Sequence, residues 1–458
     1  MTGAHGAPVT SGVATYPLLS ALANRRSRRF AKGASLDGGP LAFRSVAAPE
    51  PLTREEEASL AFAAAGITGC TLAELPYLAG DDPESGCGNI IVHFVGRTVP
   101  SGDALHSVVL FVLNDEGTWM MRRPQDLPAD ELATIVAAGR EGRLVEAYES
   151  TRVKVSSQRA SIPRKVPHVP PFNLWDSNLP GTTLFLPVTE LTSLYINVLL
   201  TAFGDELGYF VVDDHAGYRP AGIGRFRRSR GGHLYDDPGD GRMLTVGFLE
   251  TALATIAAAE EGAMHQSLAL MAEALGLGGF THACRHPAWL KALGFDVTRQ
   301  ALSRMVRMGL GARIAMRVLG WPDPSIEIPV GLRHPDRPGE WLVRPFCPPH
   351  YPDMRSAVTA FIDYKFAAGR GTLTGNGPAA WRDDGAVRRQ IPRYSPHAVD
   401  ATIAYCEYLH QRYGRFPHTV APFENILAYQ AHHLDVRFYD EFYRAEALGP
   451  RQRAHGHD

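Results

Sequence analysis

The strongest structural signal in the sequence is a helical periodicity that runs from Thr245 to Leu275. Apolar and small side chains recur along it at steps of three or four residues, which is the spacing of one face of an α-helix. Apolar residues also occupy other faces, so we predict a long central helix that is buried all round. The segment ends at Gly276-Leu277-Gly278-Gly279, and glycine after a helix favours a left-handed C-terminal cap.

Shorter patterns predict a mixture of helices and strands around this helix. Strands are predicted at 90–95, 108–113, 208–213 and 325–330, from short apolar runs rich in β-branched and aromatic residues. Further helices are predicted at 16–23, 53–65, 129–139, 141–149, 191–203, 353–367 and 397–412. Thr53 is followed three residues later by Glu56, which is the spacing of an N-terminal capping box.

Composition excludes several classes of protein. The 458 residues are 45% hydrophobic and 21% charged, which is typical of a globular chain with a sizeable core. The formal net charge of −2 gives no general attraction to nucleic acid or to an anionic membrane. We find no apolar run long enough to span a bilayer and no secretory signal. The five scattered cysteines form no CxxC pair, which fits a reducing cytoplasm.

The chain divides by composition into three parts. Residues 1–14 are small and polar, and we expect them to be disordered. Residues 15–340 form the predicted main domain, with a loop-like, proline-containing insertion near 150–190. The charged stretch 332–341 contains two prolines and suggests a boundary near 340. Residues 341–458 are then a mostly helical extension of unknown role.

A basic segment, Arg25-Arg26-Ser27-Arg28-Arg29, follows the first predicted helix within the main domain. Guanidinium groups make bidentate, charge-assisted hydrogen bonds to phosphate oxygens, and a hydroxyl group can add one more. The same segment could instead be a solvated helix end whose positive charge complements the helix dipole.

Three other segments combine small residues with buried elements. Pro100-Ser101-Gly102-Asp103-Ala104-Leu105-His106 precedes the strand predicted at 108–113. The segment from Gln266 to Gly279 follows Glu261-Gly262 and closes the long helix, and Ile326 to Gly331 ends the last predicted strand of the main domain. Taken singly, each is also explained as a turn or as a glycine-capped core element.

Together and in this order, the four segments resemble the nitroreductase-like FMN-dependent oxidoreductases, nearest the SagB-type dehydrogenase branch. The matching family patterns are R-R-S-x-R, P-S-x-G-A-x-H-P, Q-N-x-x-L-x-A with G-L-G-S, and I-P-x-G. The resemblance covers roughly residues 16–340, with divergent stretches at 31–90 and 150–245. The sequence departs from the family at Asp103, Ser107, Ser267 and Gly279.

The resemblance implies an α+β homodimer with a central mixed β-sheet flanked by helices, FMN in clefts at the dimer interface, and hydride transfer through flavin N5. It implies a small-molecule or peptide substrate, such as a natural-product intermediate, and NAD(P)H as a candidate electron donor. No residue is assigned a catalytic role. The expected cofactor-binding residues are Arg25, Arg26, Ser27 and Arg29 for the phosphate, Pro100, Ser101, Gly102, Gly278 and Gly279 around the ring system, and Arg333 for a further phosphate contact.

Two other interpretations remain open at this stage. One is a non-catalytic flavin-binding or pseudoenzyme partner in a biosynthetic complex. The other is a metal-dependent enzyme that uses His432, His433 and Asp435, because imidazole and carboxylate groups are normal ligands of divalent metals.

Overall fold

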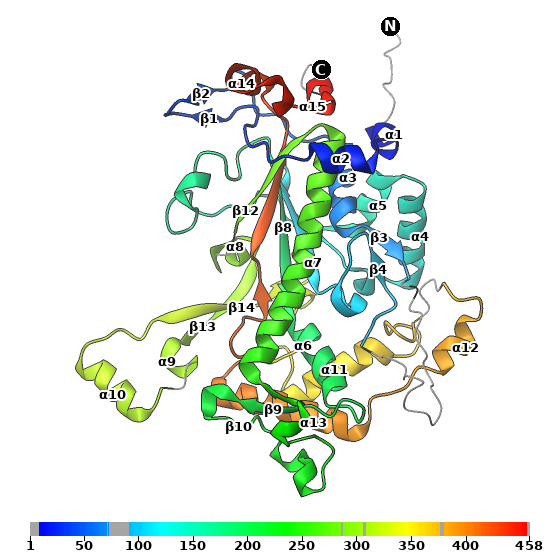
Figure 1. Ribbon diagram of the computed structural model, residues 1–458, viewed down its shortest axis with the longest axis vertical. Helices are drawn as coiled ribbons and strands as arrows, with labels where there is room; N and C mark the ends of the chain where they lie inside the picture. Colours follow the sequence, from blue (N-terminus) through cyan, green and yellow to red (C-terminus); the bar gives the residue numbers. More distant parts are fainter. Residues whose placement is uncertain are drawn as a thin grey trace.

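The computed structural model describes residues 9–70, 72, 91–284, 287–305, 308–375 and 380–455 (Figure 1). The predicted strand 90–95 begins outside these ranges, and residues 91–95 form no strand. Cys87 also lies outside them. Helix α1 (Val9–Ala14) occupies part of the stretch that we expected to be disordered, and α2 (Leu18–Asn24) agrees with the helix predicted at 16–23.

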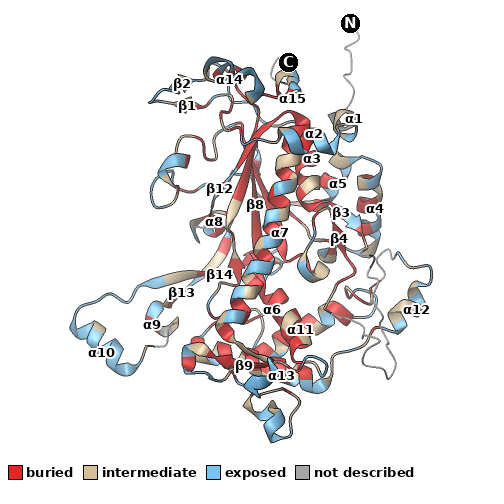
Figure 2. Ribbon diagram, in the orientation of Figure 1, coloured by how far each residue is buried: buried red, intermediate tan, exposed pale blue. Residues whose placement is uncertain are grey.

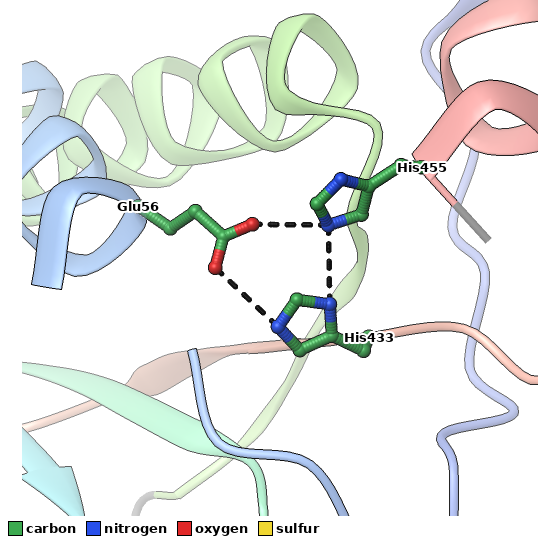
Figure 3. A group of neighbouring side chains, drawn as sticks. All are labelled: Glu56, His433 and His455. Carbon is green, nitrogen blue, oxygen red and sulfur yellow. Dashed lines mark hydrogen bonds and ion pairs between the residues drawn. The ribbon is translucent and has the colours of Figure 1, made fainter. Parts of the chain in front are cut away.

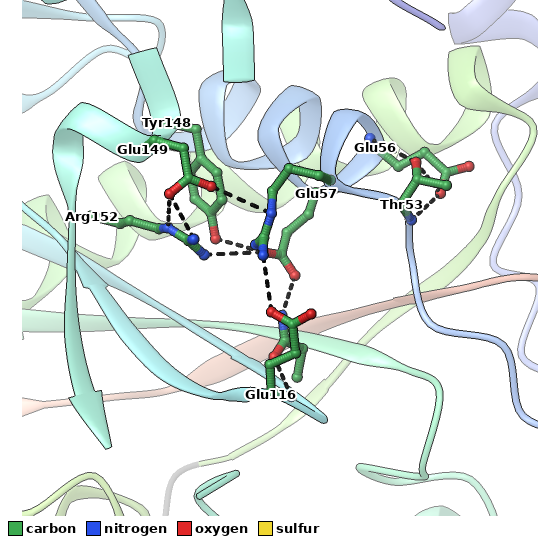
Figure 4. Close-up of polar contacts among 9 residues, drawn as sticks. Thr53, Glu56, Glu57, Glu116, Tyr148, Glu149 and Arg152 are labelled. Carbon is green, nitrogen blue, oxygen red and sulfur yellow. Dashed lines mark hydrogen bonds and ion pairs between the residues drawn. The ribbon is translucent and has the colours of Figure 1, made fainter. Parts of the chain in front are cut away.

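Helix α3 (Arg54–Ala65) begins with the predicted capping box. The Thr53 backbone N–H donates to Glu56 Oε2 at 2.7 Å, and the Glu56 N–H donates to Thr53 Oγ1 at 3.3 Å (Figure 4). These reciprocal bonds satisfy two backbone donors that the first turn of a helix leaves without partners. The local sequence therefore sets the start of this helix.

A buried polar cluster attaches α3 to its neighbours. Glu57 accepts from Tyr148 Oη at 2.7 Å and from Asn114 Nδ2 at 2.6 Å, and it pairs with Arg54 at 3.1 Å (Figure 4). Tyr148 belongs to α5 (Leu144–Thr151) and Asn114 ends strand β5 (Val108–Asn114). One carboxylate thus joins two helices and the central sheet.

The central sheet has seven strands. Their order is β12 (Gly278–Ala283), β17 (Leu427–His432), β8 (Thr183–Glu190), β5, β6 (Gly117–Met121) and β7 (Arg152–Ser156), and β16 (Phe423–Glu424) also pairs with β8. Every pairing within it is antiparallel, so the prediction of a mixed central sheet is wrong for these strands. All residues of β5 and β8 are buried, and a run buried on both faces does not reveal the direction of its neighbours.

Strand β17 lies inside this sheet although it comes from the last part of the chain. It pairs with β12 on one side, where Gly278 is opposite His432, and with β8 on the other. The predicted boundary near residue 340 therefore does not separate two folding units. The residues after it contribute β15 (Trp341–Val343), β16 and β17 in addition to helices.

Helix α7 (Val246–Leu275) confirms the long helix, and Gly276 caps it with φ of 84°. The prediction that it is buried all round is wrong. One stripe is exposed along its length and includes Phe248, Ile256, Ala259 and Gly262 (Figure 2). The four glutamates of the helix are buried instead, which reverses the usual distribution of charge on a surface helix.

Two groups of helices pack beside the sheet and α7. The helices α4 (Ala129–Arg140) and α5 lie beside α3, and α6 (Leu191–Ala202) packs with α11 (Met354–Phe366) and α13 (Pro396–Tyr413) in a second core (Figure 1). The remaining helices are α8 (Pro287–Ala292), α9 (Leu302–Met305), α10 (Leu310–Val318), α12 (Asp384–Arg389), α14 (Val436–Phe442) and α15 (Pro450–His455).

The other strands form small sheets. β9 (Phe210–Asp213) lies between β10 (Arg219–Pro220) and β11 (Met243–Thr245), and β14 (Ser325–Arg333) lies between β13 (Phe295–Ala301) and β15. Two further pairs are β1 (Ser35–Leu36) with β2 (Phe43–Arg44) and β3 (Ile67–Gly69) with β4 (Gly96–Arg97). None of the described helices combines the length and the apolar character that crossing a membrane requires.

Candidate functional site

The structure brings two of the predicted site segments together. The backbone N–H of Arg28 donates to the carbonyl of Gly279 at 3.2 Å, in an isolated antiparallel bridge. The basic segment 25–29 therefore runs along the start of β12, immediately after the C-terminal end of α7. About 250 residues of chain separate these segments, so only the tertiary fold makes them neighbours.

Three residues of the basic segment carry no ion pair to another described residue. Arg25 is half-buried, Arg26 and Ser27 are exposed, and Arg26 Nη1 donates to the backbone carbonyls of Ala23 and Arg25 at 3.2 and 2.9 Å. Two guanidinium groups and a hydroxyl with no carboxylate partner are the donor set that a phosphate group requires. This corner of the molecule fits the phosphate of FMN.

The two remaining arginines of the segment are neutralised by carboxylates of the same chain. Arg28 is 4% exposed and its Nη1 lies 2.7 Å from Glu273 Oε2, which is also buried. Arg29 Nε lies 2.6 Å from Asp176 Oδ2, and the guanidinium carbon lies 4.6 Å from the centre of the Phe280 ring. Arg28 therefore has a structural role, and the predicted phosphate contact of Arg29 would have to compete with Asp176.

The chain's own side chains fill the space beside the two glycines of β12. A Cβ atom on Gly279 would lie 2.3 Å from Tyr429 Oη, and one on Gly278 would lie 2.4 Å from Leu434 Cδ2. The close approach of Tyr429 in β17 and of Leu434, two residues after that strand, explains why both positions are glycine. Their predicted place against the flavin ring has no support from this geometry.

The Pro100–Gly102 loop lies against the middle of α7 rather than beside the basic segment. Ser101 Oγ donates to Glu260 Oε2 at 2.6 Å, and a Cβ atom on Gly102 would lie 2.5 Å from Ile256 Cγ2. Fifteen residues of α7 separate Glu260 from Leu275, which is about 22 Å along a helix. Within one chain, the predicted ring-binding loop and the predicted phosphate-binding segment therefore contact well-separated parts of the molecule along α7.

Buried charged and titratable groups surround this loop. Arg97 Nη1 donates to the carbonyl of Val108 at 2.8 Å, and burial lowers the pKa of its guanidinium to about 10. Burial and the nearby Arg97 lower the pKa of His106 to about 3, so the imidazole is neutral. Burial also raises the pKa of Glu260. Asp103, Ala104 and His106 all have positive φ, which marks a strained backbone of the kind that clusters at functional sites.

Lys365 on α11 is a candidate functional residue that the sequence reasoning missed. Its side chain is fully buried, and Nζ donates to Asn197 Oδ1 at 2.7 Å and to Tyr394 Oη at 2.9 Å. Burial holds the pKa of the ammonium well below its ordinary value, although Asp103 of the loop opposes the shift. Helical spacing could have predicted that Lys365 is buried, because it shares the inward face of α11 with Val358 and Phe361.

A cavity of about 270 Å³ lies beside the same loop. Its wall includes Phe94, Val95 and Gln125, and Gln125 Nε2 donates to the carbonyls of Leu105 and His106 at 2.8 and 3.2 Å. This volume is just below the usual range of small-molecule pockets. The loop, the buried ionisable groups and the cavity form a second candidate region, which is separate from the basic segment.

Arg333 lies in neither region. It ends β14, where its Nε lies 2.7 Å from Asp296 Oδ2 and its guanidinium carbon lies 4.3 Å from the centre of a Trp341 ring. These contacts lie in the small sheet of β13, β14 and β15. The structure does not bring Arg333 to the basic segment, so the predicted phosphate contact is not formed within one chain.

The three residues of the metal hypothesis also do not converge. Asp435 accepts from Ser45 Oγ at 2.6 Å and from the Arg437 backbone N–H at 3.1 Å, where it caps α14. His432 faces β12, because a Cβ atom on Gly278 would lie 2.6 Å from its Nε2. Successive residues of an extended chain point to opposite sides, so His432 and His433 cannot bind one ion together.

The chain shows little similarity to known proteins. No protein-family model matches the chain, and no curated protein matches it either. Among solved structures, the chain is similar to a "putative nitroreductase" from Ralstonia eutropha JMP134, with 12% sequence identity. That match covers 61% of this chain and 77% of the other, with a TM-score of 0.28.

Proposed function

We propose that this protein is an FMN-dependent oxidoreductase of the nitroreductase-like type, in which Arg25, Arg26 and Ser27 hold the FMN phosphate. The observation that carries the proposal is the bridge between Arg28 and Gly279. It joins two segments that both resemble family motifs, and among the described residues Arg25, Arg26 and Ser27 have no carboxylate partner. When bound, FMN would supply hydride transfer through N5.

The chain's own groups would bind and orient this cofactor. Arg25 and Arg26 would neutralise the phosphate charge, and the Ser27 hydroxyl would donate one further hydrogen bond. The buried ion pair of Arg28 with Glu273 fixes the backbone from which these side chains project. Pro100, Ser101 and Gly102 lie against the middle of α7. They could contact the flavin ring only if the bound cofactor extends along this helix from the phosphate site.

The proposal includes a homodimer that forms through α7. The exposed residues of this helix are uncharged, and α2, which packs against it, exposes Leu18, Leu19 and Leu22. An uncharged stripe of this length on a surface helix is typical of an interface. Ala259→Glu should convert a dimer into a monomer, as measured by light scattering after size-exclusion chromatography. A wild-type monomer at micromolar concentration would contradict the dimer.

The finer parts of the function rest on the sequence resemblance alone. These are the SagB-type branch, dehydrogenation of a peptide or natural-product intermediate, and NAD(P)H as the electron donor. The cytoplasmic location inferred from the scattered cysteines is likewise a proposal.

The visible absorption spectrum of the purified protein, before and after addition of FMN, tests the cofactor assignment. We expect one FMN per chain in the wild type and at least tenfold weaker binding when Arg25 and Ser27 are both replaced by alanine. Arg44→Ala is the matched control, because Arg44 is an exposed arginine 80% accessible to solvent. Binding that is unchanged in the double variant would refute the phosphate site, and a wild type that binds no FMN would refute the function.

A non-catalytic flavin-binding or pseudoenzyme role in a biosynthetic complex is the second candidate. The specific observation in its favour is that Tyr429 and Leu434 fill the space beside Gly279 and Gly278. This alternative predicts that the protein binds FMN but does not reduce added acceptors. Neither NADH nor NADPH would support turnover, and flavin reduced by dithionite would not pass its electrons to an acceptor. Steady substrate turnover by the flavin-loaded protein would exclude it.

A further inference from the structure

Three side chains from distant parts of the sequence converge near the C-terminal helix. Glu56 belongs to the first turn of α3, His433 directly follows β17, and His455 ends α15 (Figure 3). One ligand atom from each lies within 4.8 Å of the others. Glu56 and His433 are buried, and the side chain of His455 is 31% exposed.

Their separations are those of ligands around one small cation. His455 Nε2 lies 3.0 Å from Glu56 Oε1 and 3.1 Å from His433 Nδ1. In a tetrahedral zinc site with bonds of about 2.0–2.1 Å, neighbouring ligand atoms lie roughly 3.3 Å apart. A shift of a few tenths of an ångström would admit such an ion.

The two imidazoles face each other through their nitrogens. The ring planes are inclined by only 16° and the ring centres are 5.0 Å apart, whereas the facing nitrogens are 3.1 Å apart. The facing nitrogens are thus much closer together than the ring centres, so the two imidazoles approach each other through their nitrogen atoms (Figure 3). A single N–H hydrogen on His455 cannot make straight hydrogen bonds to Glu56 and His433 at once.

The second oxygen of Glu56 and the second nitrogen of His433 make contacts outside the centre of the cluster. Glu56 Oε2 accepts from the Thr53 N–H at 2.7 Å and from Thr53 Oγ1 at 2.9 Å, which leaves Oε1 for the centre of the cluster. His433 Nε2 lies 3.3 Å from the same Oε2. A histidine that binds metal commonly directs its other ring nitrogen toward a carboxylate, which fixes the tautomer.

We propose that Glu56, His433 and His455 bind one divalent metal ion of the zinc class through Oε1, Nδ1 and Nε2. Two imidazoles with one carboxylate favour Zn²⁺ or a similar transition-metal ion over Mg²⁺ and Ca²⁺, which prefer oxygen ligands. The partial exposure of His455 leaves the fourth coordination position for water. The ion would tie α15 and the end of β17 to the start of α3.

The site is independent of the proposed flavin chemistry and is tested with metal alone. The full-length chain without a polyhistidine tag is stripped with a chelator and titrated with Co²⁺, and the visible d–d absorption is recorded. We expect one equivalent of tetrahedral Co²⁺ that Zn²⁺ displaces, together with a rise in melting temperature when Zn²⁺ is added.

His455→Gln is the decisive variant, because it changes a partly exposed residue at the end of a terminal helix. We expect it to lose the bound equivalent and the Zn²⁺-dependent rise in melting temperature, with circular dichroism unchanged; His433→Gln should behave in the same way. His397→Gln is the control, since His397 is 47% exposed, pairs with Asp205, and lies in the first turn of α13, at the opposite end of the molecule (Figure 1).

Two results would overturn the metal site. One is a wild-type chain that takes up no Co²⁺ or Zn²⁺ at micromolar concentration, which would make the cluster a hydrogen-bonded network. The other is His455→Gln protein that binds the ion as tightly as the wild type. Neither result depends on whether the protein binds FMN.

Discussion

Glu261 on α7 should make the stability of the protein depend on pH. Its side chain is 3% exposed, and Thr189 Oγ1 donates to Oε1 at 2.7 Å. Burial is the main cause that raises the pKa of this carboxyl, from 4.5 to about 8, and the nearby charges of Glu260 and Glu424 add to it. The group therefore keeps its proton in the folded protein at neutral pH.

The size of the effect follows from this pKa difference. Below about pH 4.5 the carboxyl is protonated in the folded and unfolded chains alike, so its full contribution to stability is present. As pH rises toward 8, only the unfolded chain releases the proton, and the free energy of unfolding falls by up to about 1.4 kcal/mol per pH unit. Over the whole interval the loss is on the order of 3–5 kcal/mol.

Glu261→Gln keeps the shape of the side chain and removes the titration. Urea unfolding of wild type and variant at pH 5.5, 6.5 and 7.5 measures the difference in unfolding free energy between them. This difference should move in favour of the variant by about 1 kcal/mol per pH unit. The exposed Glu441→Gln variant controls for the loss of one carboxylate. A difference that stays constant across this range would refute the reasoning.

Three further substitutions test the packing around the candidate site, each measured by urea unfolding at one pH. Arg28→Ala should cost about 3–5 kcal/mol, because it leaves the buried Glu273 carboxylate unpaired; a loss below about 1 kcal/mol would contradict the ion pair. Gly279→Ala should cost about 1–3 kcal/mol, since its methyl group would lie 2.3 Å from Tyr429 Oη, and a neutral result would mean that β17 is not held there. Thr53→Ala should cost about 1 kcal/mol through loss of the helix cap, whereas Thr53→Ser should cost much less.

Features that depend on neighbouring residues could be predicted from the sequence. The capping box of Thr53 and Glu56, the long helix that ends at Gly276 and the buried strand β5 all agree with local patterns. Each depends on backbone geometry within a few residues, so propensity and periodicity were sufficient. The prediction that α7 is buried all round failed, because its apolar alanines and isoleucine also fit an exposed stripe.

The composition of the candidate sites could not be predicted from the sequence, because it depends on which distant segments come together in the fold. The basic segment does lie beside Gly279, as a single cofactor site requires, but the Pro100–Gly102 loop lies about 22 Å along α7 from the end of that helix. No local pattern reports such a separation. For Lys365, helical spacing could have predicted burial, but its partners Asn197 and Tyr394 come from other elements and only the fold brings them together.

By itself, the sequence determined the capped start of α3, the long helix α7 with its glycine stop and the buried strand β5, and it supplied an arginine-rich segment suited to a phosphate. The tertiary structure alone decided that β17 enters the middle of the sheet and that Glu56, His433 and His455 share one corner. The physical reason is that capping hydrogen bonds and helical periods involve residues a few positions apart, whereas strand pairing and side-chain clusters join distant segments when the whole chain buries its apolar surface.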